Sequence, residues 1–393
     1  TAVQHGASTD ALTSDLVVAK YTDNGTSATL GWTQVGGGSG PDFGAGVAVS
    51  GTSVYVTGTI ANSLADGSSV RFGGAGTTPG TVAQHGASVA ISNDLVVAKY
   101  TDNGPSATLG WTQVGGGSGA DVGNSIAVSG TSVYVTGQIF ENLSGNRAVR
   151  FGGAGTTPGT VAQHGTNTNA LASDLVVAKY TDNGPSATLG WTHVGGGAGN
   201  DLGTGIAVNG TSVYVTGTIN NSQADGSSVR FGGSGTTPGT VVQAGASASA
   251  SDDMVVARYT DNGPSATVDW THVGGGSAAD LGGAVAVSGT SVYVTCTIVN
   301  SPTDSRSVRF GGTGTTPGTT AQNGLASPEA GDVVVANYTD NGTSATLGWT
   351  QIGGGPLSDQ AHAIAVQGTE MYVAGMIRPT AEFGTATGSP VRG

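Results

Sequence analysis

Apolar and polar residues alternate in short stretches of this chain, and the stretches recur every 79 or 80 residues. Alternation over four to eight residues, bounded by Asn-Gly or Gly-Thr turns, predicts β-strands, and no stretch has the 3.6-residue period of a helix. The pattern predicts an all-β protein in which one unit is used five times. The segment Asp-Leu-Val-Val-Ala-Lys-Tyr-Thr-Asp-Asn-Gly, or a close variant of it, begins at Asp15, Asp94, Asp174, Asp253 and Asp332.

Each unit is predicted to contain four strands, which the first complete unit places at 46–50, 53–60, 95–101 and 107–114. Tandem units of four antiparallel strands are typical of a β-propeller. Small residues such as those at 44–49 suit an inner strand near the axis. The five tryptophans keep the same spacing, and we expect their side chains to be buried between blades: Trp32, Trp111, Trp191, Trp270 and Trp349.

The two ends of the chain match different parts of the unit. Residues 1–8 resemble 81–88, and residues 383–388 resemble 72–77. We therefore expect one propeller domain over 1–393, closed by a composite fifth blade that hides its sheet edges. An open β-solenoid is the alternative. The expected blades span about 42–116, 121–196, 201–275, 280–354, and 359–393 together with 1–37.

The unit is longer than a typical propeller blade of about 40–50 residues. The excess lies between strands two and three, at 61–93 in the first complete unit. It contains two short extended pieces, 69–74 and 80–85, which are predicted to pair as a small hairpin. Five such inserts are expected on one face of the disc, where binding sites on a rigid scaffold usually lie.

Composition narrows the possible partners. Only 9% of residues are charged and the net charge is −13, which disfavours nucleic acid and anionic membranes. No apolar run is long enough to span a membrane as a helix. The 71 glycines suit tight turns. The chain begins at Thr1 without Met and is expected to be a processed form. Cys296 occupies a position that holds glycine in the other units.

These repeated pieces resemble the bacterial β-propeller repeat family usually called SBBP. The resemblance rests on Asp-Phe-Gly-Ala-Gly-Val-Ala-Val at 42–49, Ser-Val-Tyr-Val-Thr-Gly at 53–58, Asp-Leu-Val-Val-Ala-Lys-Tyr at 94–100 and the strand that carries Trp111. It covers all five units. It implies a secreted or cell-surface location and no defined reaction. The insert here is longer than is usual in that family, and five blades are fewer than the six or seven often expected.

One aspartate precedes the inner strand of every unit, in a glycine-rich turn. A ring of five carboxylates could bind calcium or a cationic ligand at the mouth of a channel. The other interpretation, which the single Asp per turn favours, is that each carboxylate accepts backbone N–H bonds and fixes its turn. The residues are Asp42, Asp121, Asp201, Asp280 and Asp359. The aspartates that open strand three are interpreted as structural, and no cofactor other than calcium is indicated.

An arginine stands before a phenylalanine in four of the inserts. An exposed guanidinium beside an aromatic ring suits a sugar or carboxylate contact. The more ordinary interpretation is a phenylalanine core with a solvated arginine. The candidate ligand-binding residues are Arg71, Arg150, Arg230 and Arg309, with Glu382 at the fifth position. The six histidines have no metal-ligand spacing.

Near-identical units oppose an enzyme, because an active site needs one asymmetric cluster of acid, base and positioning groups. We therefore expect a non-enzymatic structural or binding module, suited to adhesion by multivalent attachment to glycans or other surface polymers. Two alternatives stay open. One is an extracellular glycan hydrolase or lyase with its site at the channel mouth, and the other is a self-assembling subunit of an extracellular layer or filament.

Overall fold

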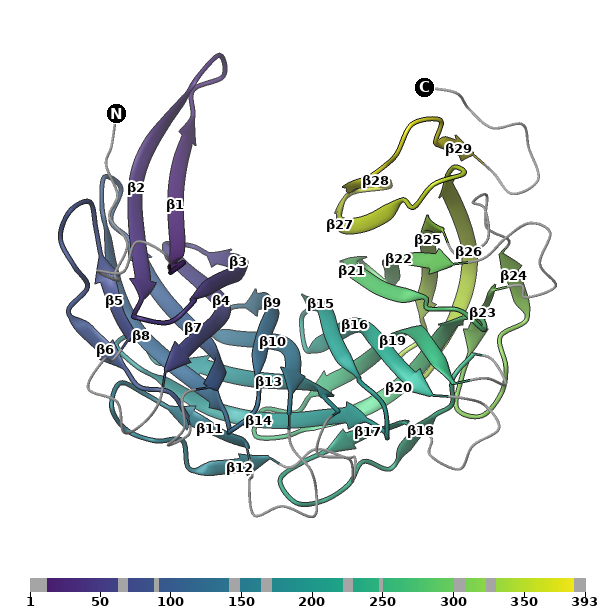
Figure 1. Ribbon diagram of the computed structural model, residues 1–393, viewed down its shortest axis with the longest axis horizontal. Coiled ribbons are helices and arrows are strands. Elements are labelled where there is room, and N and C mark those ends of the chain that lie inside the picture. The colour runs from purple at the N-terminus through teal and green to yellow at the C-terminus, as the bar shows by residue number, and fades with distance from the viewer. Residues whose placement is uncertain are drawn as a thin grey trace. The chain divides into compact units, whose positions relative to one another are not determined.

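The computed structural model describes residues 13–62, 70–87, 92–140, 149–163, 172–221, 229–246, 250–299, 308–322 and 330–384. These residues form antiparallel strands in several sheets and contain no helix, which confirms the all-β prediction (Figure 1). Within them, therefore, no helix is long and apolar enough to cross a membrane. The chain divides into two compact units: unit 1 comprises 1–165 and 176–192, and unit 2 comprises 166–175 and 193–393.

The predicted four strands are present in the first complete repeat. They are β3 (Phe43–Ser50), β4 (Ser53–Asn62), β7 (Ser92–Asp102) and β8 (Ala107–Gly116), paired antiparallel in that order. The turn between β3 and β4 uses Gly51 at φ 58°, and the turn between β7 and β8 uses Gly104 at φ 90°. Glycine enters this left-handed region without the steric cost of a Cβ, which explains the Gly-Thr and Asp-Asn-Gly signals.

The insert forms the predicted hairpin, but the hairpin lies in an unexpected place. β11 (Val149–Gly153) and β12 (Val161–Gln163) pair with each other, and β11 also pairs with β8 of the preceding repeat. The sheet in unit 1 thus runs β12-β11-β8-β7-β4-β3. The expectation of four-stranded sheets is wrong, because the insert strands pair with the last residues of strand four and extend the sheet. The expected position of the inserts on one face of a disc stays a prediction.

The glycine pair that ends strand four explains why the hairpin fits there. Gly115 lies opposite Phe151 of β11, and a Cβ added at Gly115 would overlap the phenyl ring. Phe151 is fully buried, as are the three equivalent phenylalanines Phe72, Phe231 and Phe310. A side chain at the first glycine would therefore exclude the ring that anchors the insert to the preceding repeat.

Unit 2 repeats this arrangement. Its complete sheet runs through β15 (Leu202–Asn209), β16 (Ser212–Asn221), β19 (Ser251–Asp261), β20 (Ala266–Gly275), β23 (Val308–Gly312) and β24 (Thr320–Gln322). β17 (Val229–Gly233) and β18 (Val241–Gln243) form another insert hairpin. In unit 1, β9 (Val122–Ser129) and β10 (Ser132–Ile139) are paired. β13 (Asp174–Asp182) and β14 (Ala187–Gly196) contribute residues to both units.

The sheets nearest the two ends of the chain have fewer strands. In unit 1 the order is β1 (Leu16–Asp23), β2 (Ala28–Gly37), β5 (Val70–Gly74) and β6 (Val82–Gln84). In unit 2 a five-stranded sheet contains β21 (Leu281–Ser288), β22 (Ser291–Val299), β25 (Gly331–Asp340), β26 (Ala345–Gly354) and β29 (Glu382–Gly384). β27 (Gln360–Gln367) and β28 (Glu370–Met376) form a two-stranded sheet. These described sheets are not closed, so a ring of five blades and its single-domain boundaries stay predictions.

Each unit has an apolar core of β-branched and aromatic side chains. In unit 1, Ile60, Val96 and Tyr100 are fully buried, and in unit 2 Ile298 and Tyr338 are fully buried. Four of the five tryptophans are buried as expected, whereas Trp349 remains partly exposed. Trp349 lies in β26, whose sheet is one of the shorter ones.

Candidate functional site

The aspartates before the inner strands fix the backbone. Asp121 is fully buried; its Oδ2 accepts the N–H of Gly117 at 2.6 Å, and its Oδ1 accepts the N–H of Phe140 at 2.8 Å. The bond from Oδ1 to the N–H equivalent to that of Phe140 also occurs at Asp42, Asp201, Asp280 and Asp359. The bond from Oδ2 to the N–H equivalent to that of Gly117 also occurs at Asp42, Asp201 and Asp280. The geometry therefore favours the turn-fixing interpretation of these residues over a solvent-facing ring of ligands.

The calcium alternative finds little support in the same residues. All five aspartates are at most 1% exposed. Across the ranges that the structure describes, no group of three or more His, Cys, Asp or Glu side chains is placed to hold a metal ion. Calcium prefers six to eight oxygen ligands, which two carboxylates alone do not supply.

Each of these aspartates lies near the aspartate that opens strand three. Asp94 is fully buried, its Oδ2 accepts the N–H of Ala87 at 2.9 Å, and a Cβ on Gly116 would overlap its Oδ1. Burial raises the pKa of Asp94 to about 9, and the nearby carboxylate of Asp121 acts in the same direction. The sequence shows both aspartates but not this pairing, because Asp94 lies in β7 and Asp121 in the turn before β9.

A second set of aspartates joins neighbouring repeats. Asp182 accepts hydrogen bonds from Tyr55 Oη at 2.7 Å and from Trp111 Nε1 at 3.0 Å, and its Oδ2 is 2.5 Å from Lys99 Nζ. Burial opposes the ionised form of Asp182, but the hydrogen bonds from Lys99, Tyr55 and Trp111 outweigh it and lower the pKa. In unit 2, Asp340 accepts hydrogen bonds from the equivalent residues Tyr214 and Trp270 and forms an ion pair with Arg258. The Asp-Asn-Gly signal locates these aspartates in turns but does not reveal their partners.

The four candidate arginines share one exposed setting. Arg71 lies on β5 with its Cα opposite Gly37 on one side and Ala83 on the other, so small residues flank its side chain. Arg71, Arg150, Arg230 and Arg309 are all exposed, and each precedes a fully buried phenylalanine. The fifth position differs, because Glu382 replaces the arginine and Phe383 is 45% exposed. The insert therefore presents one accessible guanidinium in each of four repeats.

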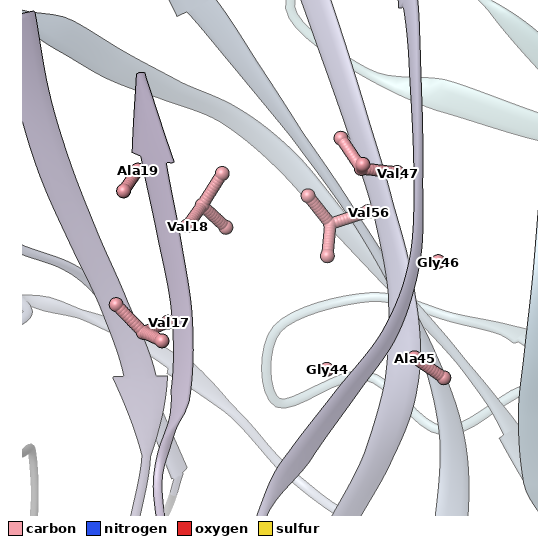
Figure 2. Close-up of a pocket in the computed structure, with 8 residues that line it drawn as sticks. All are labelled: Val17, Val18, Ala19, Gly44, Ala45, Gly46, Val47 and Val56. Atoms are coloured by element: carbon pink, nitrogen blue, oxygen red, sulfur yellow. The ribbon is translucent and has the colours of Figure 1, made fainter. Parts of the chain in front are cut away.

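An apolar groove of about 230 Å³ opens between β1 and the β3–β4 hairpin in unit 1. Val17, Val18 and Ala19 line one side, while residues 44–47 and Val56 line the other (Figure 2). Val17 is 58% exposed, whereas Val96, its equivalent in β7, is fully buried by the neighbouring strand β4. The groove thus lies at a strand edge that is covered in the complete repeat.

Unit 2 has exposed apolar residues on its two-stranded sheet. Tyr372 of β28 is 57% exposed, and Ile377, just after the strand, is also 57% exposed. The equivalents of Tyr372 in the complete sheets, Tyr55 and Tyr214, are 1% exposed. β28 therefore presents apolar side chains that an adjoining strand covers in other repeats.

The histidines form no catalytic grouping in the part of the chain that is described. His193 and His272 are buried, and burial lowers the pKa of both rings. His85 and His362 are at least partly exposed, while His5 and His164 lie outside the described residues. Cys296 is fully buried, and burial raises its pKa well above the ordinary value, so it is a poor nucleophile.

Comparison with protein-family models and with curated proteins gives no match for this chain.

Proposed function

We propose that this chain is a non-catalytic binding module of a secreted or cell-surface protein, which attaches to a glycan or other surface polymer through its insert arginines. The observation that carries the proposal is the equivalent, exposed presentation of Arg71, Arg150, Arg230 and Arg309 on four repeats. A guanidinium fork can bond sugar hydroxyls or a carboxylate in two places at once. Repetition of one weak contact suits a repeating polymer.

Linked weak sites gain affinity without any strong individual contact. Once one arginine is bound, a polymer presents its next unit to the next arginine at high local concentration, which raises overall affinity by roughly 10²–10⁴. The resemblance to the SBBP family supports the extracellular location that such a partner requires. The low charge content and net charge of −13 favour neutral or sparsely charged polymers over nucleic acid.

The proposal includes a five-bladed propeller closed by β28 alongside β1. Two features support it. The sheet of β1, β2, β5 and β6 lacks the first two strands of the six-stranded pattern, and the sheet of β27 and β28 consists of those two strands alone. Each also exposes apolar residues at the edge that is covered in complete sheets, as Val17 and Tyr372 illustrate.

Binding is tested on an array of neutral and carboxylated polysaccharides and their monosaccharides, with and without calcium. We expect the polymer that binds to exceed its own monomer by at least a hundredfold in apparent affinity. R150A should weaken polymer binding in part, and the fourfold variant R71A/R150A/R230A/R309A should abolish it. R378A is the matched control, because Arg378 is exposed but lies outside the insert hairpins.

Three results would overturn the binding proposal. The first is equal affinity for polymer and monomer, and the second is full binding by the fourfold variant. The third is catalytic turnover that one substitution abolishes, which would favour a hydrolase or lyase. Ordered self-assembly without ligand binding would support the alternative of a layer or filament subunit.

Ring closure has a separate test. The register between β4 and β7 places Val56 opposite Ala98, which corresponds to Val373 opposite Ala19. A19C/V373C should form an intramolecular disulfide in the monomer under mild oxidation, whereas A19C/A374C, shifted by one residue, should not. Absence of the first disulfide, or its formation only between molecules, would contradict closure within one chain.

A further inference from the structure

Two aspartates of each repeat meet at one buried place. Asp94, Asp121, Asp253 and Asp280 are all fully buried. In the last repeat, a Cβ added at Gly354 would overlap Asp332 Oδ1 and lie 3.1 Å from Asp359 Oδ2, so both carboxyl groups border the same small space. Glycine is required there because the carboxyl groups occupy the volume of a side chain.

The hydrogen-bond donors at this place do not suffice for two carboxylates. Both oxygens of Asp121 accept backbone N–H groups, and Asp94 Oδ2 accepts one from Ala87. Asp94 Oδ1 is buried and has no hydrogen-bond partner, and Asp253 Oδ1 is in the same situation. A buried charged oxygen without a donor is costly, and two adjacent carboxylates repel each other. One hydrogen between them would remove both costs.

We propose that each aspartate pair binds one proton, held as an O–H···O hydrogen bond between the two carboxyl groups, so that the folded repeat array is a multi-site proton-binding structure. The proton resides on Oδ1 of the strand-three aspartate and is donated to the carboxylate of the turn aspartate. The best-described pairs are Asp94 with Asp121 and Asp253 with Asp280. Each pair then contributes stability at low pH, and this contribution is lost as the pair loses its proton.

The groups around each pair agree with this assignment. Burial raises the pKa of Asp94 to about 9, the N–H of Ala87 opposes the rise, and the charge of Asp121 adds to it. Burial also raises the pKa of Asp280 to about 7, where the N–H groups of Val299 and Gly276 oppose it. Asp252 adds a third negative charge near Asp253 and Asp280. The pair of Asp94 and Asp121 is therefore the simpler one to test.

The sign of the pH dependence follows from the raised pKa. An aspartate in the unfolded chain titrates near its ordinary value of 3.8, whereas Asp94 in the folded chain keeps its proton to about pH 9. Between these values the folded state binds one more proton than the unfolded state. The unfolding equilibrium constant should therefore rise about tenfold per pH unit for each retained proton, and level off above pH 9.

The experiment compares wild type with D94N by urea unfolding at pH 5 and pH 7. The asparagine amide can place its oxygen at Ala87 N–H and its NH₂ group toward Asp121, so it supplies the hydrogen permanently. We expect the rise in the unfolding constant over these two pH units to be about 100-fold smaller in D94N than in wild type. D23N is the control, because Asp23 is exposed at the end of β1, and it should keep the wild-type rise.

A second measurement does not depend on the folding of the variant. The infrared spectrum of wild type at pH 7 should contain the carbonyl band of buried protonated carboxyl groups, and this band should disappear as the pH is raised. An absent band at pH 7, or an unchanged pH dependence in a folded D94N, would overturn the proposal. So would a rise in melting temperature on addition of calcium chloride that EDTA reverses, because the pair would then bind a cation in place of the proton.

Discussion

Removal of Asp182 should expose how much one inter-repeat aspartate contributes to stability. In D182A, Tyr55 Oη and Trp111 Nε1 lose their acceptor, and Lys99, whose side chain is only 7% exposed, loses its counter-ion. Breaking a buried ion pair on one side costs about 3–5 kcal/mol. The carbonyl of Gly184, 3.2 Å from Lys99 Nζ, remains as a partner and places the expected loss toward the lower end.

The assay is urea unfolding followed by tryptophan fluorescence, because Trp111 reports on the same site. D102A is the matched comparison: Asp102 also binds a lysine, Lys20, and a tryptophan, Trp32, but the side chains of its ion pair are 31% and 22% exposed. We expect D102A to lose clearly less stability than D182A. Equal losses, or a loss below about 1 kcal/mol in D182A, would show that burial of the ion pair does not govern its contribution.

Two further predictions concern packing and acid stability. G115A should lower the free energy of unfolding by about 1–3 kcal/mol, because its methyl group overlaps the Phe151 ring. G110A is the control and should be tolerated, since Asp269 occupies the equivalent position in another repeat. Equal losses of stability in urea unfolding would contradict the packing argument. Burial lowers the pKa of His272, so its contribution to stability is present above pH 6.5 and lost in acid. H272Q should reduce the loss of stability between pH 6.5 and pH 4.5. Glutamine is a suitable replacement, because Gln34 makes the equivalent hydrogen bond to a backbone carbonyl. If thermal melts show the same loss in H272Q as in wild type, the role assigned to His272 is wrong.

Local patterns predicted the strands because their signals are local. Alternation and the Gly51 and Gly104 turns placed β3, β4, β7 and β8 within a few residues of their observed bounds. The insert hairpin was also predicted from its own residues. The strand with which the hairpin pairs was not predicted. Pairing of β11 with β8 depends on tertiary contacts, namely an unpaired strand edge and the fit of Phe151 over Gly115.

The candidate sites divide in the same way. The turn role of Asp121 could be inferred from its glycine-rich surroundings, and its bonds to Gly117 and Phe140 agree with that role. Its proximity to Asp94 could not, because nothing in either local sequence shows which strands become neighbours. The five-fold recurrence of both aspartates, each near a glycine pair, was the available signal. The ligand-binding role of the arginines remains a prediction.

The insert of one repeat completes the sheet of the repeat before it, and this arrangement affects synthesis on the ribosome. β8 ends at Gly116, but the strand that pairs with the outer edge of its last residues begins only at Val149. At about 5–20 residues per second, that edge is bare for roughly 2–7 s after it leaves the exit tunnel. A nascent chain always ends in one unfinished sheet, so premature termination at any repeat leaves an open edge available for aggregation.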